Sequence, residues 1–461
     1  MKSGSPNLVE GRELSSPFSV AVDAASGGLY VADTGNNRVL AWRNAAGFAN
    51  GAPADVVIGQ VDKVSTSPLG PGSSRSTGLS APTAVVVDRD GNLYVADSGN
   101  NRILRFPAPF TTPGDVKTPD LVIGQRSFDA NRSNEGGVSE RSLSLSTNTL
   151  ATSGLAFDPQ GNLWVADALN HRVLRYPASS LNAGNHGPAA DLVLGQTAFN
   201  LNANPSGSAS NLRANKGVLR TPSALAIDSA GNIYVADALQ RVLFYASPLT
   251  TGKAANRLLG VPPPVQQGQP VAPEYVIGQA EGLAMLDGDR LAVADSAIHR
   301  ILIYDNQANW PLETTSISPP AVAVLGQQSF AGDRANRDRP EPADDSLASP
   351  FGLAFAGGTL YVADRGNHRV LAFPQPATGS KATRVLGQDG FNSGAVNLIE
   401  GRELFLHISQ QNAATSGGGV ALDTRTDAPH LYIADTFNNR ILGFRDARQV
   451  RPGGKADLVI G

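Results

Sequence analysis

The peptide LYVADTGNNRVL, which begins at Leu29, returns six more times along the chain in modified form. The later copies are LYVADSGNNRIL, LWVADALNHRVL, IYVADALQRVLF, LAVADSAIHRIL, LYVADRGNHRVL and LYIADTFNNRIL. Successive copies lie roughly 60 to 70 residues apart, which is long enough for each to belong to a four-stranded unit. Seven copies of one hairpin therefore predict a chain built from seven similar β-sheets.

Composition agrees with a folded, strand-rich repeat protein. The chain holds 49 Gly and 31 Pro for turns, 17% of its residues are charged, and its mean hydropathy is -0.14. A single conventional core would be too large for 461 residues, whereas a ring of repeats keeps each local core small. We therefore expect one domain that covers residues 1–461.

Each repeat reads as four strands, which we name a to d in chain order. Strand a is short and apolar, as in PTAVVVD, and alternates small with branched residues, a pattern that suits the crowded inner strand of a propeller blade. Strand b is LYVAD, strand c is RVLRF or similar, and strand d is VVIGQ or similar. Turns such as DRDGN and TGNN supply the residues that tight hairpins need.

The fold class is thus all-β, a seven-bladed β-propeller of four-stranded antiparallel blades. In blade four, NRLLG ending at Gly260 and YVIGQ ending at Gln279 compete for strand d, and the distance from Asp237 favours Gly260. The predicted blades cover residues 17–60, 82–125, 152–196, 222–260, 281–327, 350–388 and 416–461.

The order of strand a, DxxGN, LYVAD, a Gly/Asn turn and NxR resembles the NHL repeat of bacterial β-propellers. Units four and five depart from the pattern, at ADALQRV and SAIH, so we expect them to be the irregular part of the ring. Because strands a to d of the last blade all come from the end of the chain, we expect the ring to close without a shared strand, through side chains.

The connections from strand d to the next strand a are long and should share one face. Structureless loops of this length are uncommon in compact domains and are often functional. Phe128, Phe199, Phe330 and Phe391 recur three residues after the Gln of strand d, and we expect them to anchor their loops. The candidate ligand-binding loops are residues 61–81, 126–151, 197–221, 261–280, 328–349 and 389–415.

The hairpins carry a repeated Asp and a repeated Arg. An Asp at a turn accepts backbone amides, and an Arg on the next strand can form a bidentate pair with a carboxylate of its own or the adjacent blade. Because a binding site needs asymmetry, repetition in every blade favours a structural role. The residues are Asp33, Arg38, Asp97, Arg102, Asp167, Arg172, Asp237, Arg241, Asp295, Arg300, Asp364, Arg369, Asp435 and Arg440.

Three histidines, His171, His299 and His368, occupy the hairpin position that holds Asn in three other copies. Exchange of His with Asn indicates a hydrogen bond in the turn rather than a metal ligand. Similar propeller lyases use channel histidines with zinc, and this chain has no HxH or HExxH spacing.

Glu281 is the weak candidate for a catalytic or metal-binding residue. It stands at the start of strand a in blade five, where the other blades have Phe, Thr, Ser or Gly. The local AEG resembles the metal-binding glutamate of lactonase-type propellers, which would imply Ca²⁺ or Mg²⁺. The other inner strands offer apolar or hydroxyl residues, so a hydrogen-bonded or solvated glutamate is the default and no cofactor is the primary expectation.

Charge and targeting signals restrict the partners. The net charge is -3 and no Lys/Arg-rich segment interrupts the loops, which disfavours nucleic acid and hence an RNA-binding propeller. No apolar run of about 18 residues is present, and the amino end lacks the layout of a signal peptide. The absence of Cys leaves the compartment open. Resemblance to bacterial Ala/Gly/Ser/Asn-rich versions implies an extracytoplasmic segment of a larger exported protein, and we expect a monomer.

The leading hypothesis is a non-catalytic binding scaffold that recognises a protein, peptide or glycan through the face with the long d-to-a loops. The alternatives are a divalent-metal-dependent hydrolase or lyase with a site in the central channel, and an RNA-binding propeller. The sequence places any function where the repeat breaks, in the unequal loops and around blades four and five.

Overall fold

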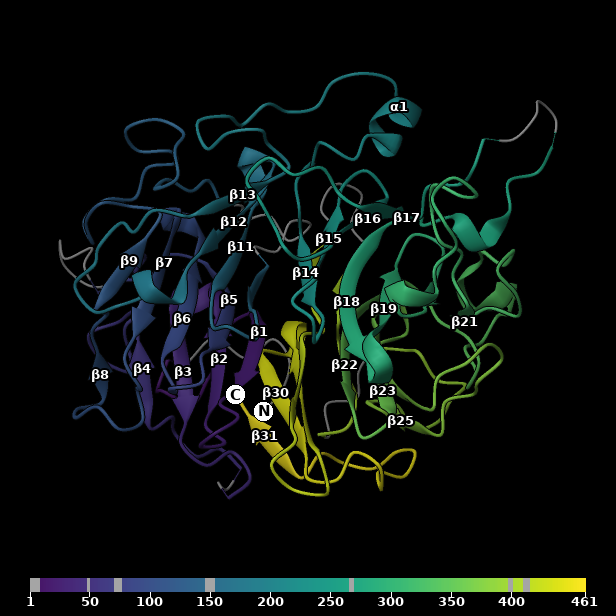
Figure 1. Cartoon of the computed structure of the whole chain (residues 1–461). Coiled ribbons are helices and arrows are strands. Elements are labelled where there is room, and N and C mark those ends of the chain that lie inside the picture. Colours follow the sequence, from purple (N-terminus) through teal and green to yellow (C-terminus); the bar gives the residue numbers. More distant parts are fainter. Residues whose placement is uncertain are drawn as a thin grey trace.

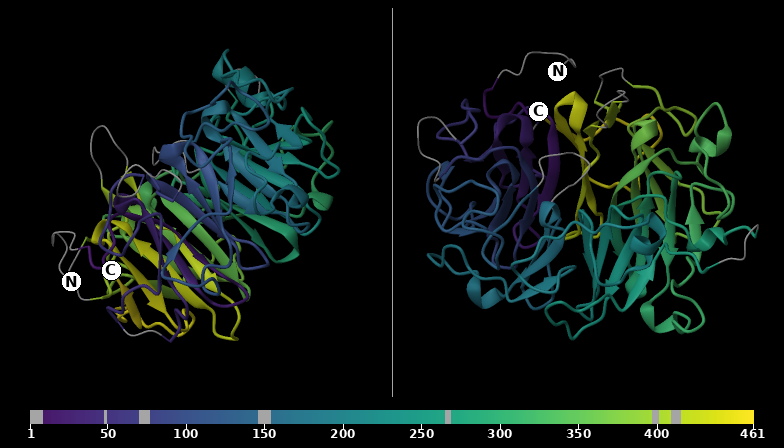
Figure 2. Two further views of the ribbon diagram at one scale, coloured as in Figure 1. Left: turned by 90° about the vertical axis from the view of Figure 1, so that its left-hand side faces the viewer. Right: turned by 90° about the horizontal axis from the view of Figure 1, so that it is seen from above.

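The computed structural model describes residues 9–47, 50–69, 77–145, 154–264, 269–396, 401–408 and 415–461. Seven four-stranded antiparallel units follow one another around a ring (Figure 1). In both views of Figure 2 the first and last units, purple and yellow, lie side by side. The predicted seven-bladed β-propeller is confirmed.

The strands of each blade follow the predicted order. Blades one to three contain β1 Pro17–Val22, β2 Leu29–Asp33, β3 Arg38–Trp42, β4 Val56–Ile58; β5 Pro82–Val87, β6 Leu93–Asp97, β7 Arg102–Phe106, β9 Leu121–Ile123; and β10 Leu155–Phe157, β11 Leu163–Asp167, β12 Arg172–Tyr176, β13 Leu192–Leu194. Blades four and five contain β14 Ala224–Ile227, β15 Ile233–Asp237, β16 Arg241–Tyr245, β17 Arg257–Leu259; and β18 Ala280–Leu286, β19 Arg290–Asp295, β20 Arg300–Tyr304, β21 Ala323–Leu325. Blades six and seven contain β22 Pro350–Ala356, β23 Thr359–Asp364, β24 Arg369–Pro374, β25 Arg384–Leu386; and β28 Val420–Asp423, β29 His430–Asp435, β30 Arg440–Phe444, β31 Leu458–Ile460.

Strand β17 lies at the NRLLG segment, which is the choice that the spacing favours for blade four. Outside the blades, a short ladder joins β26 His407–Ile408 to β27 Thr415–Ser416. The described chain has one α-helix, α1 Ala209–Ala214, in the long loop before blade four. No helix in the described ranges is long and apolar enough to span a membrane.

The turn between strands b and c takes one form in blades one, two, three, six and seven. Three residues form a 3-10 turn, and the next residue adopts a positive φ of 52 to 55°, which Asn tolerates better than most residues. These turns are η1 Thr34–Asn36, η2 Ser98–Asn100, η3 Ala168–Asn170, η9 Arg365–Asn367 and η10 Thr436–Asn438. The remaining 3-10 segments are η4 Ala178–Ser180, η5 Pro273–Tyr275, η6 Asp287–Asp289, η7 Gln307–Asn309 and η8 Ala335–Asp338.

The inner strands approach one another closely at one small-residue position. A methyl group at the glycines of this position would lie within 3.0 Å of a carbonyl oxygen on the neighbouring inner strand, so these blades require glycine there. The glycines are Gly154, Gly282, Gly352 and Gly419. Ser19, Ala84 and Ala224 occupy the same position in the other three blades. The alternation of small and branched residues in strand a is explained by this contact.

The outer edge of each blade is covered by the c-to-d loop of the next blade. Around blade one this loop contributes a fifth strand, β8 Val116–Lys117, which pairs with β4 in parallel. Around blade three, Gly252 N–H donates to the Val193 carbonyl, and around blade five Val324 N–H donates to Thr378 Oγ1. Exposed edge strands invite pairing with other chains, and these loops prevent it.

Ring closure repeats the same contacts. Strand β1 packs against β28 and β29 without joining their sheet. Ser16 N–H donates to Asn439 Oδ1 at 2.8 Å, which is the expected side-chain closure. A backbone bond from Gly51 N–H to the Val459 carbonyl is added at the rim, so closure does not rest on side chains alone.

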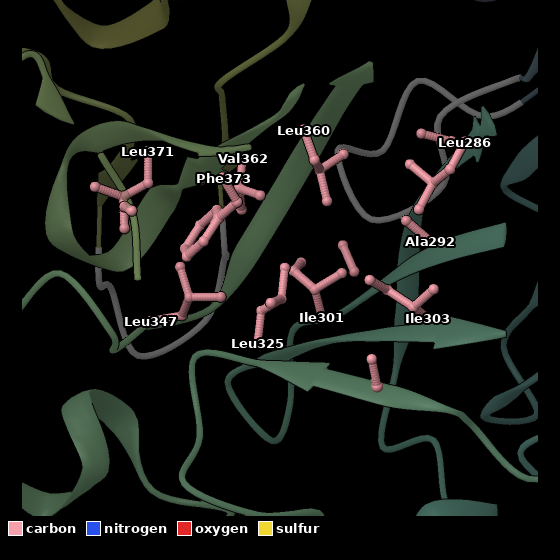
Figure 3. Packing of buried hydrophobic residues seen from close by; sticks show 14 of the residues in the cluster. Leu286, Ala292, Ile301, Ile303, Leu325, Leu347, Leu360, Val362, Leu371 and Phe373 are labelled. Carbon is pink, nitrogen blue, oxygen red and sulfur yellow. The ribbon is translucent and has the colours of Figure 1, made fainter. Parts of the chain in front are cut away.

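Apolar clusters fill the spaces between adjacent blades. Figure 3 shows the cluster between blades five and six, where Ile301 and Ile303 of β20 face Leu360 and Val362 of β23. All four of these side chains are fully buried. The core is thus a series of small clusters around the ring, as expected for a chain without a single large core.

Candidate functional site

The seven Asp/Arg pairs of the hairpins lie inside the scaffold. In blade three, Arg172 Nε donates to Asp167 Oδ2 at 2.7 Å, and both side chains are fully buried. The other oxygen, Asp167 Oδ1, accepts the backbone N–H of Ser144 from the preceding loop. Burial raises the pKa of Asp167, and Arg172 together with the donated hydrogen bonds opposes that rise. The same ion pair is present in every blade.

The remaining guanidinium nitrogens hold the long loops. In blade three, Arg172 Nη1 donates to the Phe199 carbonyl of the following loop, and Nη2 donates to the Ser139 and Ser142 carbonyls of the preceding loop. In blades one, two, three, five and six the arginine thus connects both flanking loops. The predicted bidentate pair with a carboxylate is wrong for these blades. Only Nε donates to the Asp, because Nη1 and Nη2 donate to backbone carbonyls instead.

The loop phenylalanines lie where the anchoring hypothesis expects them. Phe128, Phe199, Phe330 and Phe391 are partly buried and pack on clusters between blades. Each also offers its carbonyl to the arginine of its own blade. Side chain and backbone together attach these four loops to the ring.

The Gln that ends strand d forms a second contact, which we call the glutamine bridge. Gln125 Nε2 donates to the carbonyl of Asn101, the positive-φ residue of the turn, and to the carbonyl of Arg132 in the following loop. Blades one, two, three, five and six contain this bridge. The GQ motif therefore fixes the start of each loop over its own hairpin.

A third contact, the interblade hydrogen bond, joins the turn of one blade to the next blade. The side chain of the positive-φ residue accepts a backbone N–H there, through Asn101 Oδ1 from Leu145 and through His368 Nδ1 from Leu406. Six blades make this bond. Asn and His can replace each other at this position because Asn Oδ1 and His Nδ1 both accept the backbone N–H of the next blade. The predicted hydrogen bond exists, but it crosses between blades.

Acceptance of a hydrogen bond at Nδ1 requires a neutral ring in this orientation. Burial lowers the pKa of His171 and His299, and lowers the pKa of His368 to about 4, with a smaller contribution from His407. These histidines act as structural acceptors at neutral pH.

Glu281 lies at the wall of the central channel, a cavity of about 300 Å³ bounded by the seven inner strands. Its Oε2 is 3.2 Å from Arg365 Nη2 of blade six, and Gln279 Nε2 donates to its Oε1 at 2.9 Å. The guanidinium of Arg365 also lies 5.1 Å from the ring centroid of Phe351. The Glu281 side chain is 9% exposed.

The carboxylate of Glu281 is therefore already paired with the Arg365 guanidinium. Among the described residues, the others that line the channel are apolar, hydroxyl or glycine. Ser153, the position of blade three that corresponds to Glu281 in the sequence, lies outside the described residues. No group of three or more His, Cys, Asp or Glu residues that could hold a metal ion occurs in the described ranges. The donor set does not fit Ca²⁺ or Mg²⁺, which prefer several oxygen ligands and no adjacent cation.

Blade four lacks two of the three contacts. Val261 replaces the bridging Gln, and Gln240 occupies the positive-φ position with an exposed side chain that makes no interblade bond in the described chain. Arg213 from α1 takes over part of the role, since its Nη2 donates to the carbonyls of Gln240 and Ile277. Arg241 binds carbonyls of the preceding loop, and it makes no hydrogen bond to the described residues of the loop that starts at residue 261.

A pocket of about 740 Å³, the blade-four pocket, lies where these contacts are missing. It is bounded by α1, by the turn 238–240, by residues 261–264 and by Ile317, and most of its lining is apolar. Arg213 and Arg220 are its charged residues, and no acidic side chain is among the described lining residues. Burial lowers the pKa of Arg213, because its charge is partly removed from water.

Sequence reasoning placed the irregularity at blades four and five but did not identify the pocket, and blade five keeps the glutamine bridge and the interblade hydrogen bond. Two of its loops, 197–221 and 261–280, are among the candidate loops, whereas α1 and the cations were not singled out. The signal was the missing Gln after NRLLG, since every other internal copy of strand d continues as GQ. Parts of loops 61–81, 126–151, 261–280 and 389–415 lie outside the described residues.

The fold and its buried hairpin pairs define a seven-bladed repeat propeller. The NHL repeat model matches residues 14–42, 79–106 and 347–373, which lie in blades one, two and six. Blades one, two and six of this seven-bladed β-propeller thus contain NHL repeats. No curated protein matches it in sequence.

Solved structures share the fold at low identity. A catalytically inactive virginiamycin B lyase from Staphylococcus aureus with quinupristin has a TM-score of 0.50 and 10% identity, covering 95% of this chain and 96% of that one. Hydrazine synthase of Kuenenia stuttgartiensis has a TM-score of 0.52 and 11% identity, covering 94% of this chain and 96% of that one. At these identities the likeness establishes the propeller fold and nothing about activity.

Proposed function

We propose that this chain is a non-catalytic binding module that recognises a protein, peptide or glycan through its long-loop face. The observation that carries the proposal is a difference between the repeated hairpins and blade four. The ionisable residues of the hairpins are engaged in the scaffold, whereas the blade that lacks two scaffold contacts has a largely apolar pocket. Pockets of roughly 300 to 1,000 Å³ with few polar groups are typical binding sites.

Exposed apolar side chains also favour the long-loop face as the binding surface. Nine large apolar side chains are exposed in the described chain, and six of them belong to the d-to-a loops or to a b-to-c turn on that face. These six are Val61, Val64, Leu169, Leu201, Val271 and Val396. The rim offers less to a partner, because c-to-d loops already cover the outer strands.

A divalent-metal-dependent hydrolase or lyase in the channel has less support. Its candidate residue, Glu281, is paired with Arg365 across two blades. The virginiamycin B lyase structure is similar to this chain in fold alone, and fold does not determine function. The RNA-binding alternative also has little support, because the net charge is -3.

The test selects ligands from a displayed random peptide library and a glycan array on the intact chain, then maps the binders. Leu201→Asp, Val64→Asp and Ala238→Glu alter the long-loop face, and Leu312→Asp, at a position 76% exposed in a c-to-d loop, is the matched control. We expect at least one loop-face variant to weaken binding tenfold or more, with the control unchanged. Binding lost with Leu312→Asp alone, or no saturable binder, would contradict the proposal.

A further inference from the structure

We propose that the blade-four pocket binds the C-terminal residue of a peptide, with the apolar side chain in the pocket and the terminal carboxylate at Arg220. The proposal rests on the function proposed above and names the chemistry of its ligand. It combines two properties of one place in the molecule: an apolar lining and arginine side chains that have no ion pair in the described chain.

The apolar part of the site comes from three separate segments. Leu212 and Ala214 belong to α1, Leu239 to the turn, and Val261 and Pro262 to the loop after strand d. In blades with the GQ motif, a Gln stands at the position of Val261 and donates to the turn and to the following loop. Because blade four has Val261 instead, apolar surface borders the pocket where another blade has a hydrogen-bonded amide.

The charged part consists of two arginines with no ion pair in the described chain. Arg220 is exposed, and no hydrogen bond or ion pair involves its side chain there. Arg213 is held by two carbonyls, while its Nε is buried without a hydrogen-bond partner. The exposed Arg220 guanidinium therefore has donors to offer to a carboxylate, which is why we place the carboxylate at Arg220 and not at Arg213.

A peptide C-terminus meets both requirements within one residue. Its carboxylate and side chain leave the same Cα atom, so a hydrophobic last residue brings an anion and an apolar group into the pocket together. An internal Asp or Glu would bring the charge without the apolar group. The pocket volume, about 740 Å³, admits more than a single side chain.

The experiment uses the full chain and three fluorescein-labelled probes. The first is Gly-Gly-Ser-Leu-Leu with a free carboxylate, the second is the same peptide as its C-terminal amide, and the third ends in Ser-Ser with a free carboxylate. Fluorescence anisotropy should show saturable binding of the first probe, and binding of the other two weaker by tenfold or more. Octanoate serves as an unlabelled competitor that offers carboxylate and chain without a peptide.

Two matched variants locate the carboxylate. Arg220→Gln should weaken the free-carboxylate probe about tenfold and leave the affinity for the amide unchanged. Arg126→Gln makes the same substitution at an exposed position of the equivalent loop after blade two, and should change neither affinity. Far-ultraviolet circular dichroism of both variants verifies that the fold is retained.

Three results would overturn the proposal: equal affinity for the carboxylate and amide probes, equal effects of the two arginine variants, or displacement of the first probe by octanoate as effective as by the unlabelled peptide. If none of the probes binds but library ligands map to other loops of this face, the peptide C-terminus proposal is wrong and the binding-module proposal stands. If library ligands map to c-to-d loops other than the one that contributes Ile317 to the pocket, the binding-module proposal itself is wrong.

Discussion

Blade three and blade four differ at a few residues, and these differences decide whether the hairpin is connected to its neighbours or borders a pocket. In blade three, Arg172, Gln196 and His171 connect the hairpin to both neighbouring loops and to the next blade. In blade four the corresponding Gln is Val261 and the corresponding turn acceptor is Gln240, and a pocket lies beside them. The repeated charges of the hairpins therefore stabilise the ring, whereas the substitutions at Val261 and Gln240 accompany the pocket.

The largest expected effect concerns the buried ion pairs. Asp167→Ala should lower the free energy of unfolding by about 3 to 5 kcal/mol, because it leaves the Arg172 guanidinium buried without its carboxylate. Asp237→Ala should cost less, because Arg241 lies 3.1 to 3.4 Å from Asp237 and has four other carbonyl acceptors. Chemical denaturation of both variants measures the difference.

Asp191→Ala is the control for this prediction, since the Arg175–Asp191 pair is partly exposed and should contribute about 1 kcal/mol or less. Equal losses for Asp167→Ala and Asp237→Ala would remove the energetic distinction between the two blades.

The second expected effect is pH dependence. The pKa of His368 is about 4 in the folded chain, below its ordinary value of 6.5, because the ring is buried. The unfolded chain therefore binds this proton first as pH falls, and the stability contribution present above pH 6.5 is lost towards pH 4. The loss should be on the order of 3 kcal/mol.

His368→Asn isolates this effect, because Asn fills the same position in blades one, two and seven. The variant should keep the interblade hydrogen bond. It should lose the part of the stability change between pH 7 and pH 4.5 that comes from protonation of His368. Denaturation at both pH values should show a smaller decrease for the variant than for the parent chain. An identical decrease would mean that the histidine does not titrate in this way.

The channel wall provides a third comparison. Gly352→Ala in blade six should cost about 1 to 3 kcal/mol, because the added methyl group would meet the Gly418 carbonyl. Ala224 of blade four occupies the equivalent position with a methyl group already present, so Ala224→Gly should cost less than about 1 kcal/mol. Thermal and chemical denaturation measure both. A larger loss for Ala224→Gly would show that the inner strand of blade four is packed as tightly as the others.

The sequence was sufficient to predict the seven blades, the place of strand d in blade four and the scaffold role of the hairpin charges, because each rests on repetition. It was insufficient for contacts that cross between repeats. The acceptor for Leu406 N–H is His368, 38 residues away, and the counterion of Glu281 is Arg365 in another blade. Strand β8 and helix α1 also escaped prediction, because each is short and occurs once.

The smallest expected effect compares the two turn residues at the positive-φ position. Asn101→Ala should cost about 1 kcal/mol, because its side chain accepts from Leu145 N–H and donates to the Asn131 carbonyl. Gln240→Ala should change the free energy of unfolding by less than about 0.5 kcal/mol, because that side chain is exposed. Parallel denaturation of the two variants is the measurement, and equal losses would contradict the account of blade four.

Hydrogen–deuterium exchange of the chain with and without the tightest peptide from the display selection tests the central claim most directly. If binding occurs where the repeat breaks, amide protection should rise in residues 207–220, 238–240 and 261–264, with little change in the equivalent segments of blades two and three. Protection confined to the d-to-a loops 61–81 and 126–151, or to the c-to-d loops around the rim, would contradict the claim.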